Sequence, residues 1–295
     1  MALVGCSSRV FSSLLCSSTE HYFYFTSIHS NSIYYGRVYF VVRLLFLLSF
    51  KETIRTIMSL YTIYIFDVDG TLTPSRDIID STFESFLLDW VMLRNVHLIT
   101  GSDYEKTIEQ IGPELAERVM AVHNCAGNSR WSRGKEVYKS DWKISPEAKA
   151  WLQEKLEKSN FVLRTGQHIE ERCGLVNFST LGRGASRAER QIYIKFDIHY
   201  QERKQLVIDF NKQFDGLEAA IGGETGIDIY EKGRNKAQLL SHLGEVEEIH
   251  FFGDAIYEGG NDWPLAEAIR NRDNPLDSIH PVTSWEETYS LLQEM

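Results

Sequence analysis

The chain has 295 residues, of which 43% are hydrophobic and 24% are charged. This composition is typical of a globular protein that buries a hydrophobic core, and the length suits one large domain or two medium ones. It excludes an intrinsically disordered chain, a collagen and a membrane protein with several spans. The formal net charge of -10 argues against nucleic acid as the main partner, because duplex binding depends on clustered Lys and Arg.

Residues 1–57 differ from the rest of the chain. They contain two acidic and five basic residues, so the net charge of residues 58–295 is -13. One interpretation of these residues is a membrane anchor, but the apolar run at 38–50 is interrupted by Arg43 and is shorter than the about 20 residues of a membrane-spanning helix. A basic, Ser-rich leader also fits an organelle transit peptide. A third interpretation, which we favour, takes Met58 as the functional start and leaves residues 1–57 out of the folded protein.

Two cysteines, Cys125 and Cys173, lie in residues 58–295. Two thiols are too few for a disulfide scaffold, so the sequence favours a reducing intracellular compartment, which we take to be the cytoplasm. No membrane contact is expected for residues 58–295.

Hydrophobic periodicity from residue 58 predicts short strands that alternate with helices. In the first part, strands are expected at 61–66, 96–100 and 119–123, and helices at 78–92 and 104–111. In the last part, strands are expected at 227–230 and 249–252, and helices at 236–243 and 285–292. Such alternation predicts an α/β domain with a parallel sheet covered on both faces, which binds ligands at the carboxyl ends of its strands.

The middle of the chain reads as a separate α+β module. Ser145-Pro146-Glu147 is a good helix start, with Ser as the cap and Pro at the first helical position. Strand-like runs follow at 161–163, 168–170 and 175–178, and helices at 186–195 and 200–213. Successive strands without helices between them suggest hairpins. We therefore predict an inserted domain over 137–226, and a core domain formed by 58–136 and 227–295.

The sharpest motif is Phe66-Asp67-Val68-Asp69-Gly70-Thr71-Leu72-Thr73, directly after an apolar strand. Two carboxylates at the end of a buried strand repel each other and are poorly solvated, unless a cation or a reaction requires them. The N–H groups of the turn can bind an anion. A plain Asp-rich loop is the alternative, and the flanking residues argue against it.

Three further segments follow strands in a similar way. Thr100-Gly101-Ser102-Asp103 precedes a helix, so Ser102 either binds a phosphate oxygen or simply caps the helix. Lys236 follows Gly233-Arg234-Asn235, and a lone Lys there is commonly solvated. Asp254 and Asp262 flank a glycine-rich loop that follows a strand.

Taken in order, these segments resemble the motifs of the haloacid dehalogenase-like superfamily of phosphoryl-transfer enzymes. The resemblance implies a Rossmannoid core with a parallel sheet and an inserted cap. It implies Asp67 as the nucleophile and Asp69 as the general acid/base, with Ser102 and Lys236 stabilising charge. Mg²⁺ would be held by the Asp67 side chain, the Asp69 carbonyl and Asp254, with Asp262 nearby.

The inserted module carries Arg172-Cys173-Gly174-Leu175-Val176-Asn177-Phe178-Ser179, and then Arg183 and Arg190 on a following segment. Arginine suits bidentate phosphate recognition, although these residues could instead pair with local acids such as Glu170, Glu171 and Glu189. The segment resembles the cap of the eukaryotic-type phosphomannomutases. This resemblance covers about residues 61–262 and implies sugar-phosphate contacts by five residues: Arg76, Arg172, Arg183, Arg190 and Asp228.

The family resemblance implies an isomerase that interconverts mannose 6-phosphate and mannose 1-phosphate through an aspartyl-phosphate and a hexose 1,6-bisphosphate, which also serves as activator. It places the enzyme in GDP-mannose biosynthesis and implies a homodimer through the cap. A sugar-phosphate phosphatase of the same superfamily is the alternative, and a catalytically silent sugar-phosphate-binding protein is a third. This chain departs from the family pattern at four places, which bear on the choice between mutase and phosphatase. It has Cys125-Ala126-Gly127 where the family has Glu-Asn-Gly, Gly226 where the family has Ser, and Ala255 where the family has Lys. Trp263-Pro264-Leu265-Ala266 shows no clear match to the family's loop for an additional cation.

Overall fold

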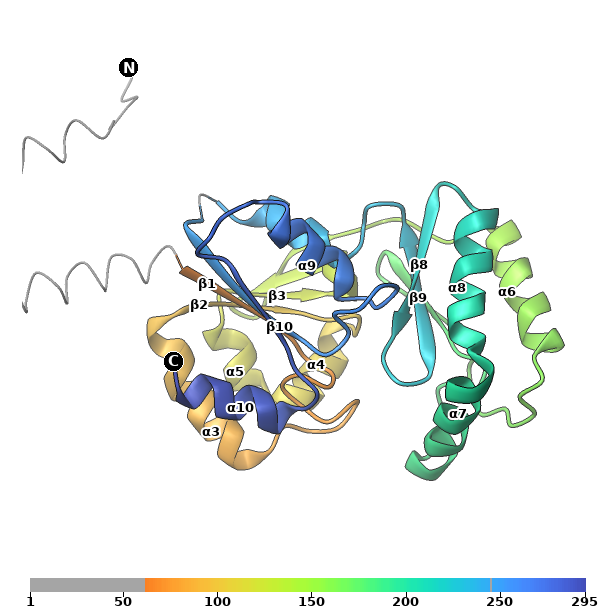
Figure 1. Ribbon diagram of the computed structural model, residues 1–295, viewed down its shortest axis with the longest axis horizontal. Helices are drawn as coiled ribbons and strands as arrows, with labels where there is room; N and C mark the ends of the chain where they lie inside the picture. The colour runs from red at the N-terminus through yellow and green to blue at the C-terminus, as the bar shows by residue number, and fades with distance from the viewer. Residues whose placement is uncertain (1–61, 245) are drawn as a thin grey trace, which may run out of the picture. The chain divides into compact units, whose positions relative to one another are not determined.

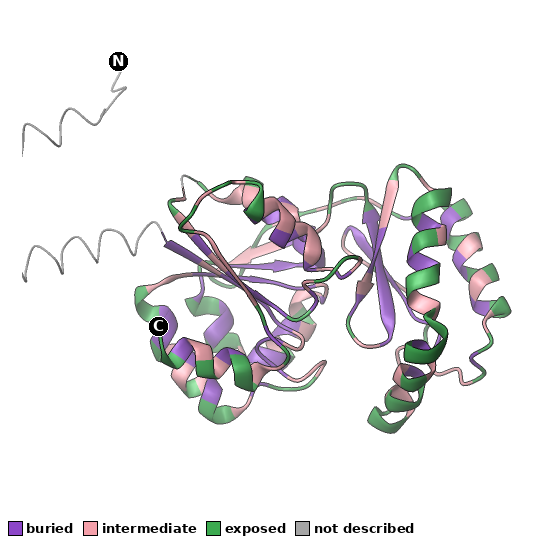
Figure 2. Ribbon diagram, in the orientation of Figure 1, coloured by how far each residue is buried: buried purple, intermediate pink, exposed green. Residues whose placement is uncertain are grey.

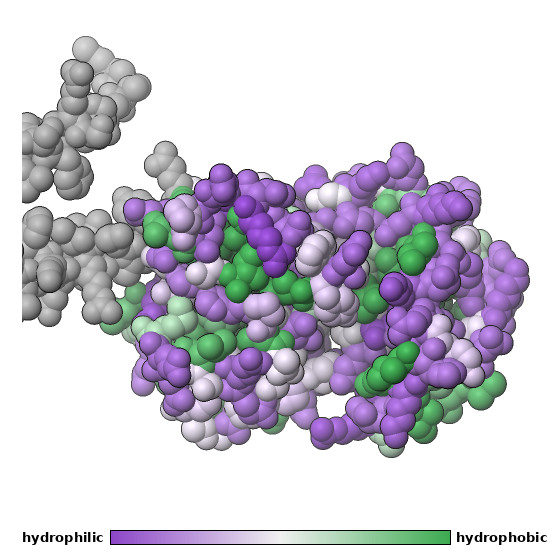
Figure 3. Space-filling view, in the orientation of Figure 1, coloured by the Kyte–Doolittle hydropathy of each residue, from purple (hydrophilic) through white to green (hydrophobic). Residues whose placement is uncertain are grey.

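The computed structural model describes residues 62–244 and 246–295 (Figure 1). The interpretations of residues 1–57 therefore lie outside the described residues. The chain divides into two units, Met1–Thr53 and Ile54–Met295, and everything below concerns the second. No helix within the described ranges is long and apolar enough to cross a membrane. The face seen in Figure 3 is mostly hydrophilic, with hydrophobic side chains in separate small groups.

A sheet of seven strands forms the core domain, in the order β11-β10-β1-β2-β3-β4-β5. Its parallel strands are β1 (Thr62–Asp67), β2 (Asn95–Ile99), β3 (Ala121–Asn124), β10 (Glu248–Gly253) and β11 (Ser278–Pro281). An antiparallel hairpin of β4 (Ser129–Ser132) and β5 (Lys135–Lys139) extends one edge. The predicted parallel α/β sheet is confirmed.

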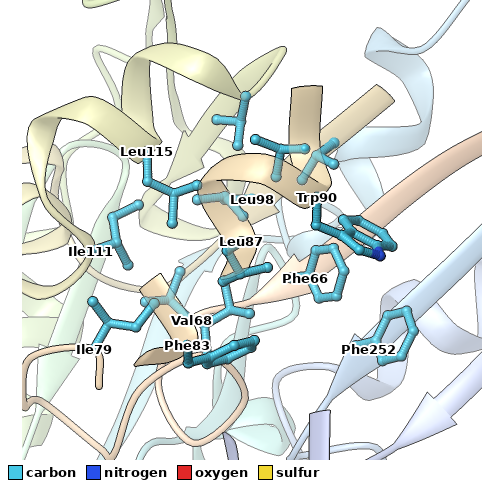
Figure 4. Close-up of a cluster of buried hydrophobic side chains, with 14 of the residues drawn as sticks. Phe66, Val68, Ile79, Phe83, Leu87, Trp90, Leu98, Ile111, Leu115 and Phe252 are labelled. Atoms are coloured by element: carbon cyan, nitrogen blue, oxygen red, sulfur yellow. The ribbon is translucent and has the colours of Figure 1, made fainter. Parts of the chain in front are cut away.

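Helices cover both faces of this sheet, so β1, the middle one of its five parallel strands, is buried along most of its length (Figure 2). Phe66 of β1 packs on one face in a cluster with the helices α3 (Ser81–Trp90), α4 (Tyr104–Ile111), α5 (Pro113–Arg118) and α10 (Trp285–Gln293) (Figure 4). Ile65 faces the other cluster, with η3 (Lys236–His242) and α9 (Trp263–Arg270). The burial of neighbouring residues on opposite faces fixes β1, and hence Asp67 at its end.

The inserted segment forms a second, antiparallel sheet in the order β6-β7-β9-β8. Its strands are β6 (Ile169–Arg172), β7 (Leu175–Phe178), β8 (Leu217–Gly222) and β9 (Gly226–Glu231). Helices α6 (Pro146–Lys158) and α8 (Glu202–Gln213) cover one face, where they pack on Val176, Phe178, Ile227 and Ile229. Because side chains alternate along a strand, Asn177 and Asp228 belong to the opposite face.

The helix starts follow the sequence closely. Ser145 caps α6 by accepting a hydrogen bond from the N–H of Ala148, and Pro146 is the first helical residue, as predicted. Helix α7 (Arg187–Tyr200) begins with a capping box, in which Ser186 and Glu189 satisfy each other's backbone N–H groups.

Some predicted elements differ from the structure. Residues 161–163 form no strand, because Phe161 instead packs against Leu181 and Tyr193 beside α7. The strand predicted at 227–230 forms as β9, but it pairs with β7 and β8 of the second sheet. The expected boundary at 226/227 thus falls inside β9, and the one at 136/137 falls inside β5, which belongs to the first sheet. The chain returns to the core domain only at η3.

Candidate active site

The turn after β1 is built around Asp67, whose side chain is buried at the carboxyl end of the strand. The carbonyl of Val68 accepts hydrogen bonds from the N–H groups of Leu72 and Thr73, which folds the chain back at once. Gly70 has a φ of +84°, and a Cβ there would lie 2.5 Å from Asp254 Oδ2. Only glycine allows both this backbone conformation and the close approach of Asp254.

Lys236 is a buried charge, not a solvated one. Its Nζ donates hydrogen bonds to Asp67 Oδ1 at 2.5 Å and to Asp262 Oδ1 at 2.7 Å, and its side chain is 1% exposed. Burial by itself lowers the pKa of Lys236, but Asp262 and Asp67 outweigh that effect and raise the pKa. The ammonium therefore stays protonated and links two carboxylates from different loops.

Asp67, Asp254 and Asp262 form a cluster whose candidate ligand oxygens all lie within 4.8 Å of one another. Burial raises the pKa of Asp67 well above its usual value, against the opposing effect of Lys236. Loss of solvation beside the cluster and the charge of Asp262 raise the pKa of Asp254 to about 7, although part of this residue is exposed to solvent. Three carboxylates face one ammonium here, so a hard divalent cation such as Mg²⁺ fits the donor set and its charge.

Asp262 uses both oxygens in contacts with the protein. Oδ1 accepts from Lys236, and Oδ2 accepts from the N–H of Ala255 at 3.0 Å. Gly253 leaves room for it, because a Cβ there would be 2.8 Å from Asp262 Oδ2. Asp67 and Asp254 are therefore the freer ligands, with Asp262 beside them.

Asp69 points elsewhere. Its Oδ1 accepts hydrogen bonds from the N–H of Arg76 at 2.6 Å and from Gln110 Nε2 at 3.0 Å, while Ser102 Oγ lies 3.3 Å from Oδ2. Ser102 is not the cap of α4, because the side chain of Asp103 performs that role. The hydroxyl of Ser102 is thus available in the site.

The arginines of the inserted domain converge and are also paired with acids. Arg172 donates to Gly101 O at 2.6 Å and to Glu170 at 2.6 Å. Glu170 Oε2 also lies 2.7 Å from Arg183 Nε. Of the local acids named from the sequence, Glu170 pairs with these arginines, and it offsets two positive charges without removing them from the site. Phosphate binding by the arginines stays a prediction.

The other two arginines add to the same positive charge. Arg190 Nη1 lies 3.7 Å from the carboxylate of Glu224. Burial, together with Arg190 and Arg172, lowers the pKa of Arg76, and burial with neighbouring guanidiniums lowers that of Arg183 to about 10. Such mutual repulsion makes the cluster a good place for an anion.

Asp228 lies where the two sheets meet. Its Oδ1 accepts from Asn177 Nδ2 at 2.7 Å. A Cβ on Gly222 would lie 2.2 Å from Asp228 Oδ2, and one on Gly101 would lie 2.8 Å from it. A Cβ on Gly226 would meet Asn177 Nδ2 at 2.9 Å, so Asn177 fills the space that a Ser at 226 would need.

A pocket of about 560 Å³, its open mouth included, brings most of the predicted residues together. Nine of them line it: Asp67, Asp69, Arg76, Ser102, Arg172, Arg183, Arg190, Asp228 and Asp254. Lys236 and Asp262 do not line the pocket and lie behind Asp67. The sequence analysis missed Gln110, Glu224 and a role for Asn177. Of these three residues, only Asn177 could have been found from the sequence, because it lies in the cap motif at 172–179.

The departure at Cys125-Ala126-Gly127 has a structural counterpart. All three residues have positive φ, at 51°, 58° and 93°. Burial raises the pKa of the Cys125 thiol to about 12, so it is not a nucleophile at neutral pH. This segment follows β3 and shapes the backbone beside Ser102, whose carbonyl accepts from the Cys125 N–H.

An Asp-x-Asp turn with a buried first carboxylate after the central parallel strand, a lysine linked to it and a cap inserted into the core define a haloacid dehalogenase-like phosphoryl-transfer fold. The C-terminal domain of a trehalose-6-phosphate phosphatase from C. albicans superposes with a TM-score of 0.55 and covers 81% of this chain and 94% of that one. At 15% identity this likeness is one of fold.

Comparison with known sequences assigns the chain to a narrower group within this fold. The profile of the family described as eukaryotic phosphomannomutase matches residues 83–295. A phosphomannomutase from Galdieria sulphuraria is 32% identical over 250 residues, which is 79% of this chain and 94% of the relative. One from Saccharomyces cerevisiae is 32% identical over 255 residues, with the same coverage. The chain belongs to the eukaryotic phosphomannomutase family. Asp67 and Asp69 lie before the residues that the family profile matches, but within the 79% of the chain that is aligned with these relatives.

Proposed function

We propose that the protein is a phosphomannomutase, which interconverts mannose 6-phosphate and mannose 1-phosphate. Family membership supports this, and one observation carries it: a single pocket is lined by the Asp67/Asp69 pair and by four arginines. A mutase must hold one phosphate beside the nucleophile while it clamps the other, whereas a simple phosphatase needs only the first site. The arginines Arg76, Arg172, Arg183 and Arg190 supply the second.

In this function Asp67 attacks the phosphorus atom and becomes an aspartyl-phosphate. Asp69 gives a proton to the leaving sugar oxygen and later takes one from the incoming hydroxyl. Lys236 holds Asp67 in place and offsets its charge, and Ser102 donates to the phosphoryl group being transferred. Asp228 and the arginines bind the rest of the sugar phosphate. The hexose 1,6-bisphosphate formed midway must turn round before the second transfer.

The acidic cluster would hold Mg²⁺ through Asp67, Asp254 and the carbonyl of Asp69, with Asp262 close by. The ion would supply charge neutralisation for the transferred group. Hexose 1,6-bisphosphate would act as activator, because it phosphorylates Asp67 in the resting enzyme. We extend this proposal to a cytoplasmic homodimer joined through the cap, acting in GDP-mannose biosynthesis. Light scattering on the purified chain tests the dimer.

A sugar-phosphate phosphatase is the second candidate. Glu170 and Glu224 already offset three of the arginines, and Gly226 offers no hydroxyl to a sugar. Both features reduce the affinity of the second site for phosphate, and a phosphatase does not need that site.

Phosphorus NMR of the full chain with mannose 1-phosphate, Mg²⁺ and a hexose 1,6-bisphosphate separates the two. Conversion to the 6-phosphate with little inorganic phosphate is expected. Steady release of phosphate without isomerisation would overturn the mutase in favour of the phosphatase. Asp67→Asn should abolish turnover while the fold persists. Full activity in that variant would show that Asp67 is not the nucleophile.

Arg190 offers a matched test of substrate binding. Arg190→Met should raise KM for the sugar phosphate about 10- to 100-fold, the value of a lost charge-assisted hydrogen bond of about 1.5–3 kcal/mol. Arg187→Met, at the exposed start of the same helix and away from the pocket, is the control and should leave KM unchanged. Equal effects of the two changes would place substrate elsewhere.

A further inference from the structure

Gln110 is a buried polar side chain on α4 that contacts Asp69. Its Nε2 donates to Asp69 Oδ1 at 3.0 Å and to Thr73 Oγ1 at 3.2 Å, and lies 3.5 Å from Asp77 O. The carboxylate and the carbonyl only accept hydrogen bonds, so the amide nitrogen must be the atom that faces them.

The other end of the amide is left without a partner. Gln110 Oε1 is buried and has no hydrogen-bond partner among the described residues. An unsatisfied buried polar atom is unfavourable, and a methionine of similar shape would avoid it. The adjacent Ile111 shows that this part of α4 accepts a purely apolar side chain. Packing therefore does not account for a glutamine at 110, whereas the contacts of its Nε2 do.

The two oxygens of Asp69 have different surroundings as a result. Oδ1 receives two N–H groups, from the Arg76 backbone and from Gln110. Within residues 62–244 and 246–295, Oδ2 has a single long contact, 3.3 Å to Ser102 Oγ. A proton on Oδ1 would point at two N–H groups that are themselves donors. The proton of the carboxyl group therefore belongs on Oδ2, the oxygen that can carry it toward the pocket.

We propose that Gln110 is a positioning residue for phosphoryl transfer: with the Arg76 N–H, it orients the Asp69 carboxyl so that Oδ2 delivers the proton to the leaving oxygen. This rests on the proposed function of Asp69. In the step, the bond from phosphorus to the sugar oxygen breaks and a bond from phosphorus to an Asp67 oxygen forms. The proton moves from Asp69 Oδ2 to the sugar oxygen, and it returns to Oδ2 from the incoming hydroxyl in the second transfer.

A purely structural role is the competing explanation, because the Gln110 carbonyl accepts the Ile79 N–H at 2.8 Å and holds the loop that carries Arg76. That backbone contact remains in a side-chain variant. The two roles differ in how the loss depends on the leaving group. A sugar hydroxyl leaves only with a proton, whereas the acetate of acetyl phosphate leaves without one.

Quench-flow of the full chain with Mg²⁺ measures the rate at which Asp67 becomes labelled from radiolabelled hexose 1,6-bisphosphate or acetyl phosphate. For Gln110→Met we expect labelling from the bisphosphate to slow about 10- to 100-fold, part of the about 10²–10⁴-fold that a general acid contributes. Labelling from acetyl phosphate should change less than about threefold. Gln110→Asn, whose side chain is one methylene shorter, should slow labelling in the same way as Gln110→Met. It takes the place of Gln110→Met if Gln110→Met does not fold. Ile111→Val controls for stability and should slow neither donor.

The variant Asp69→Asn connects the inference to the proposed function. The double variant Asp69→Asn/Gln110→Met should be no slower than Asp69→Asn alone, because Gln110 acts through Asp69. Equal slowing of both donors in Gln110→Met, or additive losses in the double variant, would overturn the role of Gln110 only. If Asp69→Asn itself slows both donors equally, then the acid assigned to the proposed function is wrong.

Discussion

Lys236 Nζ lies 2.5 Å from Asp67 Oδ1, and the two side chains are 1% and 5% exposed. Removal of the ammonium would leave Asp67 and Asp262 buried without the positive charge that offsets them. We expect Lys236→Met to abolish activity and to lower the free energy of unfolding by about 3–5 kcal/mol. Urea denaturation and the NMR assay measure both. Lys232→Met, which breaks only an exposed pair with Asp215, is the control and should change neither.

Gly70 tests the close approach of Asp254. Gly70→Ala places a Cβ 2.5 Å from Asp254 Oδ2 at a φ of +84°, whereas a Cβ at Gly233, with a φ of +81°, meets no atom of the described residues within 4 Å. Both should lose about 1–2 kcal/mol through the left-handed backbone, and Gly70→Ala should lose more and also weaken Mg²⁺ binding. Calorimetric titration with Mg²⁺ and urea unfolding provide the data. Equal losses in the two variants would argue against the contact.

Glu170 offsets the charges of two arginines. Arg172 and Arg183 hold the pKa of Glu170 below its usual value, against the effect of its burial. Glu170→Gln should strengthen the binding of inorganic phosphate about threefold to tenfold, because more positive charge faces the ligand. Its neighbour Glu171 pairs with Lys149 at the surface, so Glu171→Gln should leave phosphate affinity unchanged. Weaker phosphate binding in Glu170→Gln would mean that Glu170 serves to orient the arginines.

Two histidine pairs on the first sheet predict a loss of stability in acid. His97 Nδ1 lies 3.2 Å from His123 Nε2, and His250 Nδ1 lies 3.2 Å from His280 Nε2. Burial, aided by nearby positive charge, lowers the pKa of His97 and that of His280 to about 4. Between about pH 6.5 and pH 4 the unfolded chain therefore binds more protons, and stability falls as the pH is lowered.

The size of that loss can be measured with a double variant. Each imidazole should account for on the order of 1–2 kcal/mol, after allowance for partial exposure. His97→Gln/His280→Gln should consequently lose less stability than the wild type between pH 7 and pH 4.5 in urea unfolding. The same loss in both proteins would show that other groups control acid unfolding.

The residues at strand ends were predictable, because parallel strands gather their carboxyl ends at one edge whatever lies between them. Asp67, Ser102 and Asp254 reached the pocket for this reason. The burial of Lys236 was not predictable from a lone lysine, since it depends on partners in distant segments. Gln110 lies in a stretch whose periodicity shows only a helix.

The sequence also does not reveal to which of the two sheets β9 belongs. An alternating strand such as Gly226–Glu231 fits either sheet, and pairing with β7 and β8 decides the matter. Likewise, Glu224 pairs with Arg190 although the two residues are far apart in the sequence, and no local pattern reveals such a pair. The motifs predicted which side chains matter, and long-range packing determined what surrounds them.

The position of β1 between β2 and β10 has a consequence for synthesis of the chain. The strand that carries Asp67 emerges from the ribosome before every other strand of its sheet, while β10 ends at Gly253. Until then one edge of an apolar strand is open, and Lys236, Asp254 and Asp262 are not yet in place. Asp67 is thus made early and its surroundings late, and an apolar strand that stays unpaired during synthesis is prone to pair with other chains.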